Sequence, residues 1–133
     1  MTTTSAAIYN AEDGSSVLVS VHGEPNVIVP ALQKIIVGGR LAEFMAHGDY
    51  WQVLAHDDLS DEFGTPAPGL GIVNERPVAP AYATAPEGGA APRFFTSFGS
   101  EIEVDQKYAV IDGKIAIYPR GNFTYPTKHV TIK

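Results

Sequence analysis

Alternating apolar and polar positions predict several short β-strands along the chain. Residues 17–22 place three valines on one face, and the Gly-Glu-Pro-Asn stretch that follows ends the run. A hydrophobic period of two is the pattern of a half-buried strand, and glycine with proline marks its end. Residues 27–29 and 50–54 are rich in β-branched or aromatic residues, which suit a pleated surface, so they are two further candidate strands.

The last third of the chain carries the pattern of a β-hairpin. Asp112-Gly113 separates two apolar runs, and an Asp-Gly pair readily adopts the positive φ angles of a tight hairpin turn. A two-residue turn at this position predicts that Val110 pairs with Ile115 and that Tyr108 pairs with Ile117.

Two further stretches in this part of the chain alternate in the same way. Residues 101–105 place acidic side chains on one face, which predicts a strand with one face in solvent. Residues 129–133 alternate up to the last residue of the sequence. A strand at this position would join either the sheet of its own chain or that of a neighbouring subunit.

A helical period replaces the alternation near the middle of the sequence. Leu41, Phe44 and Met45 lie at positions i, i+3 and i+4, which predicts a short helix over residues 40–47. The alternative is a second hairpin over residues 34–41, in which two adjacent glycines would form the turn.

Two segments lack these periodic patterns. Residues 1–16 are small and polar apart from one Ile-Tyr pair, which predicts a flexible N-terminal arm. Residues 64–93 hold six of the ten prolines, which predicts an extended loop or arm. The remaining patterns place residues 17–133 in a single β-rich domain. We therefore expect a mainly β fold, a small antiparallel β-sandwich or barrel with one or two short helices and this long Pro/Ala/Gly-rich loop.

Cysteine content, net charge and hydrophobic run length restrict the kinds of partner and the cellular compartment that we expect. The 133 residues include no cysteine, and the formal net charge is -6, which argues against nucleic acid as a partner. Residues 1–62 carry nine acidic residues against two basic ones, whereas residues 63–133 carry six against seven. Neighbouring copies with such halves would attract one another if each half formed its own face. No apolar run approaches the roughly 20 residues needed to cross a bilayer, and no secretory signal is present, so we expect neither membrane association nor export, and a cytoplasmic protein.

Metal-binding and catalytic candidates are weak. The four histidines, His22, His47, His56 and His129, match no helical metal motif. Acidic residues in the segment 57–62 offer oxygen ligands of the type that calcium prefers, but not in EF-hand order. The chain has no nucleophile elbow and no complete nucleotide-binding glycine motif. The sequence therefore predicts no enzyme, no cofactor and no metal site.

Aromatic residues concentrate beside two arginines, and these residue types are enriched in the centres of protein interfaces. The same aromatic side chains would equally fill a small β core. The predicted interface residues are Ile8, Tyr9, Tyr82, Arg93, Phe94, Phe95, Arg120, Phe123 and Tyr125.

In overall layout the chain resembles small structural proteins of tailed-bacteriophage particles, such as capsid decoration, head-tail connector or tail proteins. The layout consists of a polar arm, a compact β domain, a long loop and a terminal strand. This resemblance implies many copies bound to one another or to a larger protein lattice, a homo-oligomer located in the virion, and no cofactor.

We therefore expect a non-enzymatic structural or assembly subunit. The first alternative is a small β-sandwich module that binds carbohydrate or another small ligand through Trp51 and tyrosines, with residues 57–62 as a candidate calcium site. The second alternative is an enzyme that uses His47, Asp49, His56 or Asp57.

Overall fold

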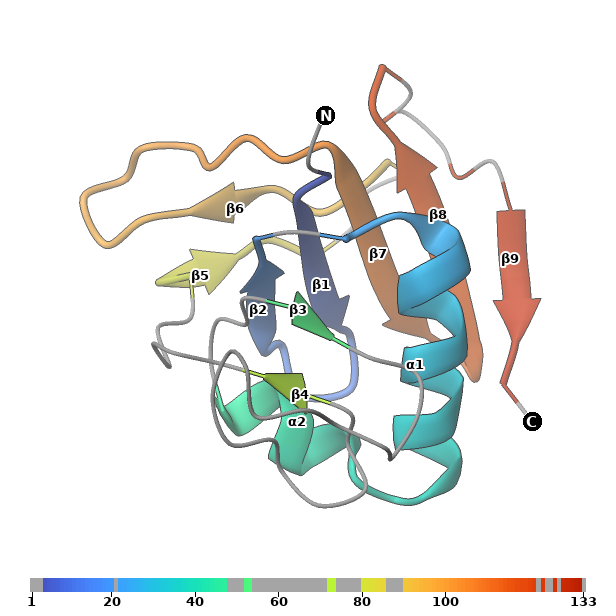
Figure 1. Ribbon diagram of the computed structural model, residues 1–133. Coiled ribbons are helices and arrows are strands. Elements are labelled where there is room, and N and C mark those ends of the chain that lie inside the picture. The colour runs from blue at the N-terminus through green and yellow to red at the C-terminus, as the bar shows by residue number, and fades with distance from the viewer. Residues whose placement is uncertain are drawn as a thin grey trace.

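A five-stranded sheet forms the centre of the protein, with helices on one face and a two-stranded ribbon on the other (Figure 1). The computed structural model describes residues 4–20, 22–47, 52–53, 72–73, 80–85, 90–121, 123, 126 and 128–132. This mainly β architecture with two short helices confirms the predicted fold class. Within the described residues no sheet closes into a barrel, so the sandwich is the form that fits.

The structure contains nine strands and two helices in the part of the chain that it describes. In chain order they are β1 (Ala6–Asn10), β2 (Ser16–Val19), α1 (Pro25–Val37), α2 (Leu41–His47), β3 (Gln52–Val53), β4 (Ile72–Val73), β5 (Tyr82–Ala83), β6 (Phe94–Phe95), β7 (Gln106–Ile111), β8 (Lys114–Pro119) and β9 (Lys128–Thr131).

The order of strands in the central sheet is β2-β1-β7-β8-β9. The predicted hairpin is confirmed as β7 and β8, with Val110 opposite Ile115 and Tyr108 opposite Ile117. Asp112 and Gly113 adopt φ angles of 52° and 73°, which a tight turn of this kind requires. The predicted terminal strand is confirmed as β9, which pairs with β8 of its own chain.

Residues 6–10 form β1, the second strand of the sheet, so the prediction of a flexible arm over residues 1–16 is wrong for this part. β1 pairs antiparallel with β2 and parallel with β7. All five of its residues are buried, because the helices cover one face and the ribbon covers the other. A strand buried on both faces needs no polar alternation, and this explains why its sequence does not look like a strand. The parallel pair also makes the sheet mixed instead of purely antiparallel.

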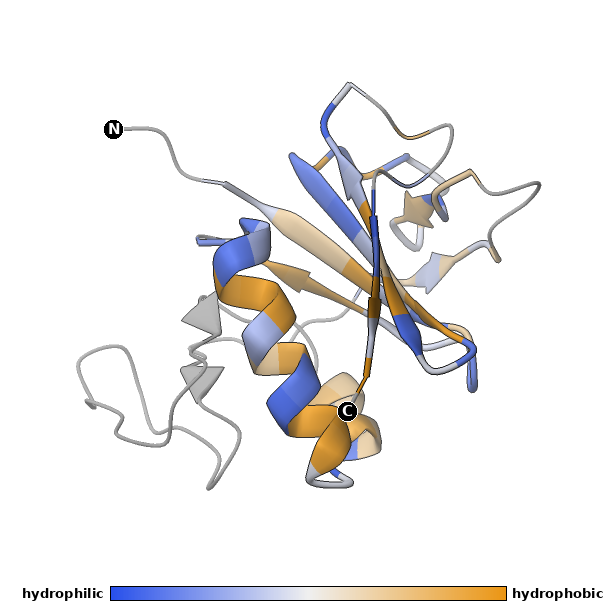
Figure 2. Ribbon diagram, turned by 90° about the vertical axis from the view of Figure 1, so that its right-hand side faces the viewer, coloured by the Kyte–Doolittle hydropathy of each residue, from blue (hydrophilic) through white to orange (hydrophobic). Residues whose placement is uncertain are grey.

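Residues 27–29 belong to helix α1, so the strand predicted there is wrong. Ile28, Ala31, Leu32 and Ile35 follow a spacing of three and four residues, and all are buried against the sheet. Figure 2 shows α1 beside the sheet, with hydrophobic residues recurring along the helix. Pro30 lies inside the helix, although proline is unfavourable in a helix interior, so local propensity does not predict a helix here. Tertiary packing of the apolar stripe outweighs that local cost.

The boundary between the two helices excludes the alternative hairpin. α1 continues to Val37, Gly38 caps it, and the backbone N–H of Gly38 donates to the Lys34 carbonyl at 3.0 Å. α2 then confirms the helix predicted for residues 40–47. Within the described residues neither helix is long and apolar enough to cross a membrane.

Tyr108 links the sheet to the segment that precedes α1. Its side chain is fully buried, and its hydroxyl donates a hydrogen bond to the carbonyl oxygen of Gly23. Burial raises the pKa of this phenol far above its ordinary value of 10.0, and the nearby Glu24 carboxylate adds to the rise. Because the folded-state pKa exceeds the unfolded one, the phenol contributes stability that is complete below about pH 10 and is lost as the pH rises further.

Replacing Tyr108 with phenylalanine is expected to lower the free energy of unfolding by about 1 kcal/mol at pH 7, because the Gly23 carbonyl loses its buried hydrogen bond. The variant should also lose less stability than the native chain between about pH 9 and 11. Urea unfolding at both pH values measures the two effects. An alkaline loss that is equal in the two proteins would contradict this role for the phenol.

The opposite face of the sheet is covered by β5, β6 and the chain that follows them. Ala7, Tyr9, Ala109 and Tyr118 point to this side and pack in one cluster with Phe94. Figure 2 shows this ribbon across the sheet from α1.

The strand predicted over residues 101–105 is wrong. Within it only Glu101 forms an isolated bridge, to Phe95. Ile102 and Val104 are half-buried against the cluster that contains Tyr9 and Phe94. Their alternation with acidic residues therefore reflects this packing, although the segment pairs with no described strand of the central sheet.

A second short ribbon confirms part of the strand predicted over residues 50–54. β3, within the predicted strand 50–54, pairs antiparallel with β4, which lies inside the proline-rich segment 64–93. The described parts of that proline-rich segment therefore include short paired strands, β4 and β5.

Candidate protein interface and buried lysine pocket

Aromatic and charged side chains gather on the outer side of the β5–β6 ribbon. The rings of Tyr82 and Phe95 stack with centroids 4.9 Å apart and planes 15° apart. The guanidinium of Arg93 lies 5.1 Å from the centroid of the Phe95 ring and forms an ion pair of 3.0 Å with Glu101. We call Tyr82, Arg93, Phe95, Phe98 and Glu101 the ribbon surface.

The pairing of Arg93 with Glu101 fixes the charges on this surface. Its hydrogen bond raises the pKa of the Arg93 guanidinium and lowers the pKa of the Glu101 carboxylate. Both groups are largely exposed, so they stay charged around neutral pH while remaining accessible to a partner. The ribbon surface thus presents one cation and one anion beside a stacked aromatic pair.

Phe98 is the most exposed large apolar residue of the ribbon surface, with 94% of its surface accessible. It lies in a tight turn in which the Thr96 amide donates to the Ser100 carbonyl and the Gly99 amide donates to the Thr96 carbonyl. Gly99 adopts a φ of 85°, which favours glycine. A hydrogen-bonded turn therefore holds this phenyl ring in solvent.

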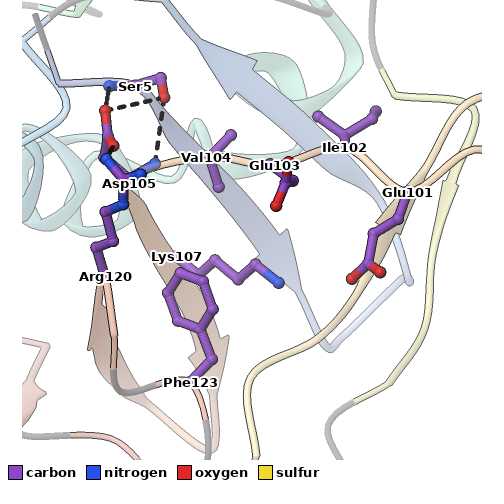
Figure 3. Close-up of a pocket in the computed structure, with 9 residues that line it drawn as sticks. All are labelled: Ser5, Glu101, Ile102, Glu103, Val104, Asp105, Lys107, Arg120 and Phe123. Carbon is purple, nitrogen blue, oxygen red and sulfur yellow. Dashed lines mark hydrogen bonds and ion pairs between the residues drawn. The ribbon is translucent and has the colours of Figure 1, made fainter.

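A pocket of about 400 Å³ lies next to the ribbon, between the sheet and residues 101–105. Figure 3 shows the side chains around it. They come from the chain before β1, from residues 101–105, from β7 and from the segment after β8. The lining residues are Ser5, Glu101, Ile102, Glu103, Val104, Asp105, Lys107, Arg120 and Phe123.

Lys107 places a cationic side chain in this pocket, although only 4% of the residue is exposed. It projects from β7 on the ribbon face of the sheet, between Ala7 of β1 and Tyr118 of β8. Its Nζ atom lies 4.5 Å from the ring centroid of Phe123 and 5.7 Å from that of Phe94. Burial lowers the pKa of this ammonium, and the Glu101 carboxylate partly opposes the shift.

The other side of the pocket is held by Asp105. Its Oδ2 atom accepts hydrogen bonds from the backbone amide and the hydroxyl of Ser5, and its Oδ1 atom accepts one of 2.9 Å from Arg120. The Ser5 hydroxyl in turn accepts a hydrogen bond from the Asp105 amide. This network links the start of β1 to the start of β7. The Asp105 carboxylate is paired with Ser5 and Arg120 of the same chain.

The structure removes three residues from the predicted interface. Ile8 and Phe94 are fully buried, and Tyr9 is 6% exposed. They fill the two sides of the sheet, so their prediction as interface residues is wrong. The alternative that aromatic residues fill the β core is correct for Tyr9 and Phe94.

The remaining predicted interface residues divide between the two features. Tyr82, Arg93 and Phe95 lie together on the ribbon surface, whereas Arg120 and Phe123 line the pocket. Tyr125 lies outside the described residues.

Sequence reasoning missed Phe98 and Lys107. Phe98 stands between polar and small residues in the stretch Thr96-Ser97-Phe98-Gly99-Ser100, which is the signal of an exposed turn. Lys107 shares the alternating face of Ala109, so its position two residues earlier could have placed it on the buried ribbon face.

The metal-site candidates fall mostly outside the described part of the chain. His22 and His129 are exposed, and the described residues contain no group of three or more histidine or acidic side chains arranged to hold a metal. The segment 57–62, Trp51, His56 and the side chain of His47 lie outside the described residues.

No protein-family model, no curated protein and no solved structure matches this chain.

Proposed function

We propose that this protein is a non-enzymatic assembly subunit whose ribbon surface contacts the same surface of a second copy. The observation that carries the proposal is the exposure of Phe98 on a hydrogen-bonded turn that follows β6, the strand whose Phe95 stacks on Tyr82. A large apolar ring held in water gains free energy when a partner covers it. Aromatic residues and arginine are also the types that dominate interface energies.

A second copy is the partner that the charges favour. Arg93 and Glu101 lie side by side on the ribbon surface, at 3.0 Å. In a twofold contact, residue i of one copy meets residue j of the other and the reverse. Arg93 of each copy can therefore approach Glu101 of its partner, while the aromatic rings meet across the axis. A surface that carries both signs of charge in this way is complementary to itself.

We further propose that this subunit assembles in a virus particle. Resemblance in layout to structural proteins of tailed-bacteriophage particles supports it, through the compact β domain, the long loop and the terminal strand. The N-terminal arm no longer contributes to the resemblance, because that segment includes β1 in the central sheet. The contact between copies does not depend on the virion setting and can be tested by itself.

Replacing Phe98 with serine is expected to weaken self-association about 10- to 100-fold, because burial of a phenyl ring contributes about 1.5–3 kcal/mol. Light scattering over a concentration series measures the change. Val37→Ser is the matched control, since Val37 is also exposed, at 60%, but ends α1 on the other face of the sheet. Equal loss in both variants, or a native chain that is monomeric at every concentration, would contradict the proposal.

A further inference from the structure

Lys107 is nearly buried on β7 and extends its ammonium into the pocket, where the described residues give it no anionic partner. Within the described residues no carboxylate lies within ion-pair distance of its Nζ atom and no hydrogen bond is formed by it. A lysine with so little exposed surface is usually paired, because even partial removal of its charge from water is costly. The ring faces of Phe94 and Phe123 offset part of that cost. An anion that entered the pocket would offset more of it.

The neighbouring charges of the pocket are already used. Arg120 binds Asp105 at 2.9 Å, and Arg93 binds Glu101 at 3.0 Å. Among the described lining residues, Lys107 is therefore the cation that remains to face an entering group. Figure 3 shows its side chain extending beside the Phe123 ring, with the ammonium on the side of Glu101 and Glu103.

The walls of the pocket define the rest of the ligand. Ile102, Val104 and Phe123 line it with apolar surface, and its volume of about 400 Å³ suits a small molecule or one side chain. Glu101 and Glu103 add negative charge at the exposed side. A ligand with a single negative charge meets less repulsion from these two acids than a phosphate dianion would, when Lys107 is the one unpaired cation among the described lining residues.

We propose that this pocket binds a carboxylate group with a small apolar body, and that the Nζ atom of Lys107 is its ion-pair donor. The carboxylate comes either from a free monocarboxylic acid or from an aspartate or glutamate of another protein copy. Both sources offer the same chemistry to Lys107. The pocket adjoins the ribbon surface at Glu101, which belongs to both, but Lys107 takes no part in the described ion pairs and ring stacking of that surface.

Titration of the full chain with phenylacetate, followed by NMR of the Lys107 side chain, tests this site. Phenylacetate should shift the Lys107 signals, and the neutral analogue phenylacetamide should bind at least about tenfold more weakly, the factor expected for loss of one charge-assisted hydrogen bond. Lys107→Met, which keeps an unbranched apolar stem, should lose binding by a similar factor. Thermal unfolding checks that this variant is folded.

Glu103→Gln provides a second variant whose effect cannot come from misfolding. It removes a like charge at the exposed side of the pocket and should tighten phenylacetate binding about two- to fivefold. Binding that is equal for acid and amide, or unchanged in Lys107→Met, would overturn the proposal. Tighter binding of inorganic phosphate than of phenylacetate would overturn the choice of carboxylate.

Concentration dependence separates the two sources of the carboxylate. If a free acid is the ligand, phenylacetate shifts the Lys107 signals equally in the native chain and in Phe98→Ser. If a second copy supplies it, the Lys107 signals shift as the native chain is concentrated, and this shift weakens in Phe98→Ser. The absence of both shifts would overturn the site while leaving the ribbon contact to its own test.

Discussion

Deletion of residues 1–10 is expected to abolish the cooperative unfolding transition of this protein. The deletion removes β1, which lies between β2 and β7 and contributes Ala6, Ala7, Ile8 and Tyr9 to the two sides of the core. Loss of a buried isoleucine or tyrosine side chain alone costs about 2–5 kcal/mol, and small domains are stable by about 5–15 kcal/mol in total. Loss of these side chains together with two strand pairings therefore exceeds what the fold can absorb.

Thermal unfolding followed by circular dichroism measures this effect. The control deletes residues 1–3 only, because the described contacts of this end of the chain begin at Thr4, whose carbonyl accepts a hydrogen bond of 2.8 Å from the Gly23 amide. That shorter chain should keep a cooperative transition. If the chain without residues 1–10 unfolded as cooperatively as the control, β1 would not be the internal strand described above.

Replacement of Gly23 with alanine is expected to lower the free energy of unfolding by about 1–3 kcal/mol, the usual cost of adding a methyl group to a packed core. A Cβ atom at this position would lie 2.6 Å from the Cβ atom of Ala6 and 3.0 Å from the backbone of Ser5 and Ala6. The Gly23 carbonyl is also held by the Tyr108 hydroxyl. The backbone before α1 therefore cannot move away from β1 without loss of hydrogen bonds.

The double variant Ala6→Gly with Gly23→Ala tests the cause of this loss. Removing the Ala6 methyl group relieves the closest contact, so the two substitutions together should cost less than the sum of their separate effects, by about 0.5–3 kcal/mol. Urea unfolding of the four proteins gives this coupling. Additive effects would show that the Ala6 methyl group does not limit the space at position 23.

The parts of the fold that the sequence predicts are those in which local pattern and tertiary environment agree. The β7–β8 hairpin has a turn pair with the required φ angles and apolar positions that alternate on both sides of it. The α2 helix has apolar residues at helical spacing, and Phe44 and Met45 are both buried. In these elements local sequence alone specifies type and register.

β1 and α1 escape prediction because their local signals differ from their surroundings in the fold. β1 is buried on both faces, so its small and apolar residues show no alternation. In α1, the β-branched residues 27–29 and Pro30 favour other structures locally. The helix forms because its apolar stripe, from Ile28 to Ile35, packs on the sheet.

The ribbon surface was predictable in part. Arginine beside adjacent phenylalanines identifies Arg93 and Phe95, but the chain gives no means of telling that Phe94 turns into the core while Phe95 stacks with Tyr82. The pocket was not predictable, because it joins Ser5, Lys107 and Arg120 from distant parts of the sequence. Such a combination depends on the parallel pairing of β1 with β7, which no local pattern specifies.

Site-specific photo-crosslinking from position 98 tests the contact between copies most directly. A photoreactive phenylalanine analogue replaces Phe98 in the full chain, and the same analogue at Val37 provides the reference. We predict covalent dimers from position 98, with the crosslinked peptide of the second copy containing residues of β5 or β6, and few dimers from position 37. Crosslinks that are absent at position 98, or equally frequent from both positions, would contradict assembly through the ribbon surface.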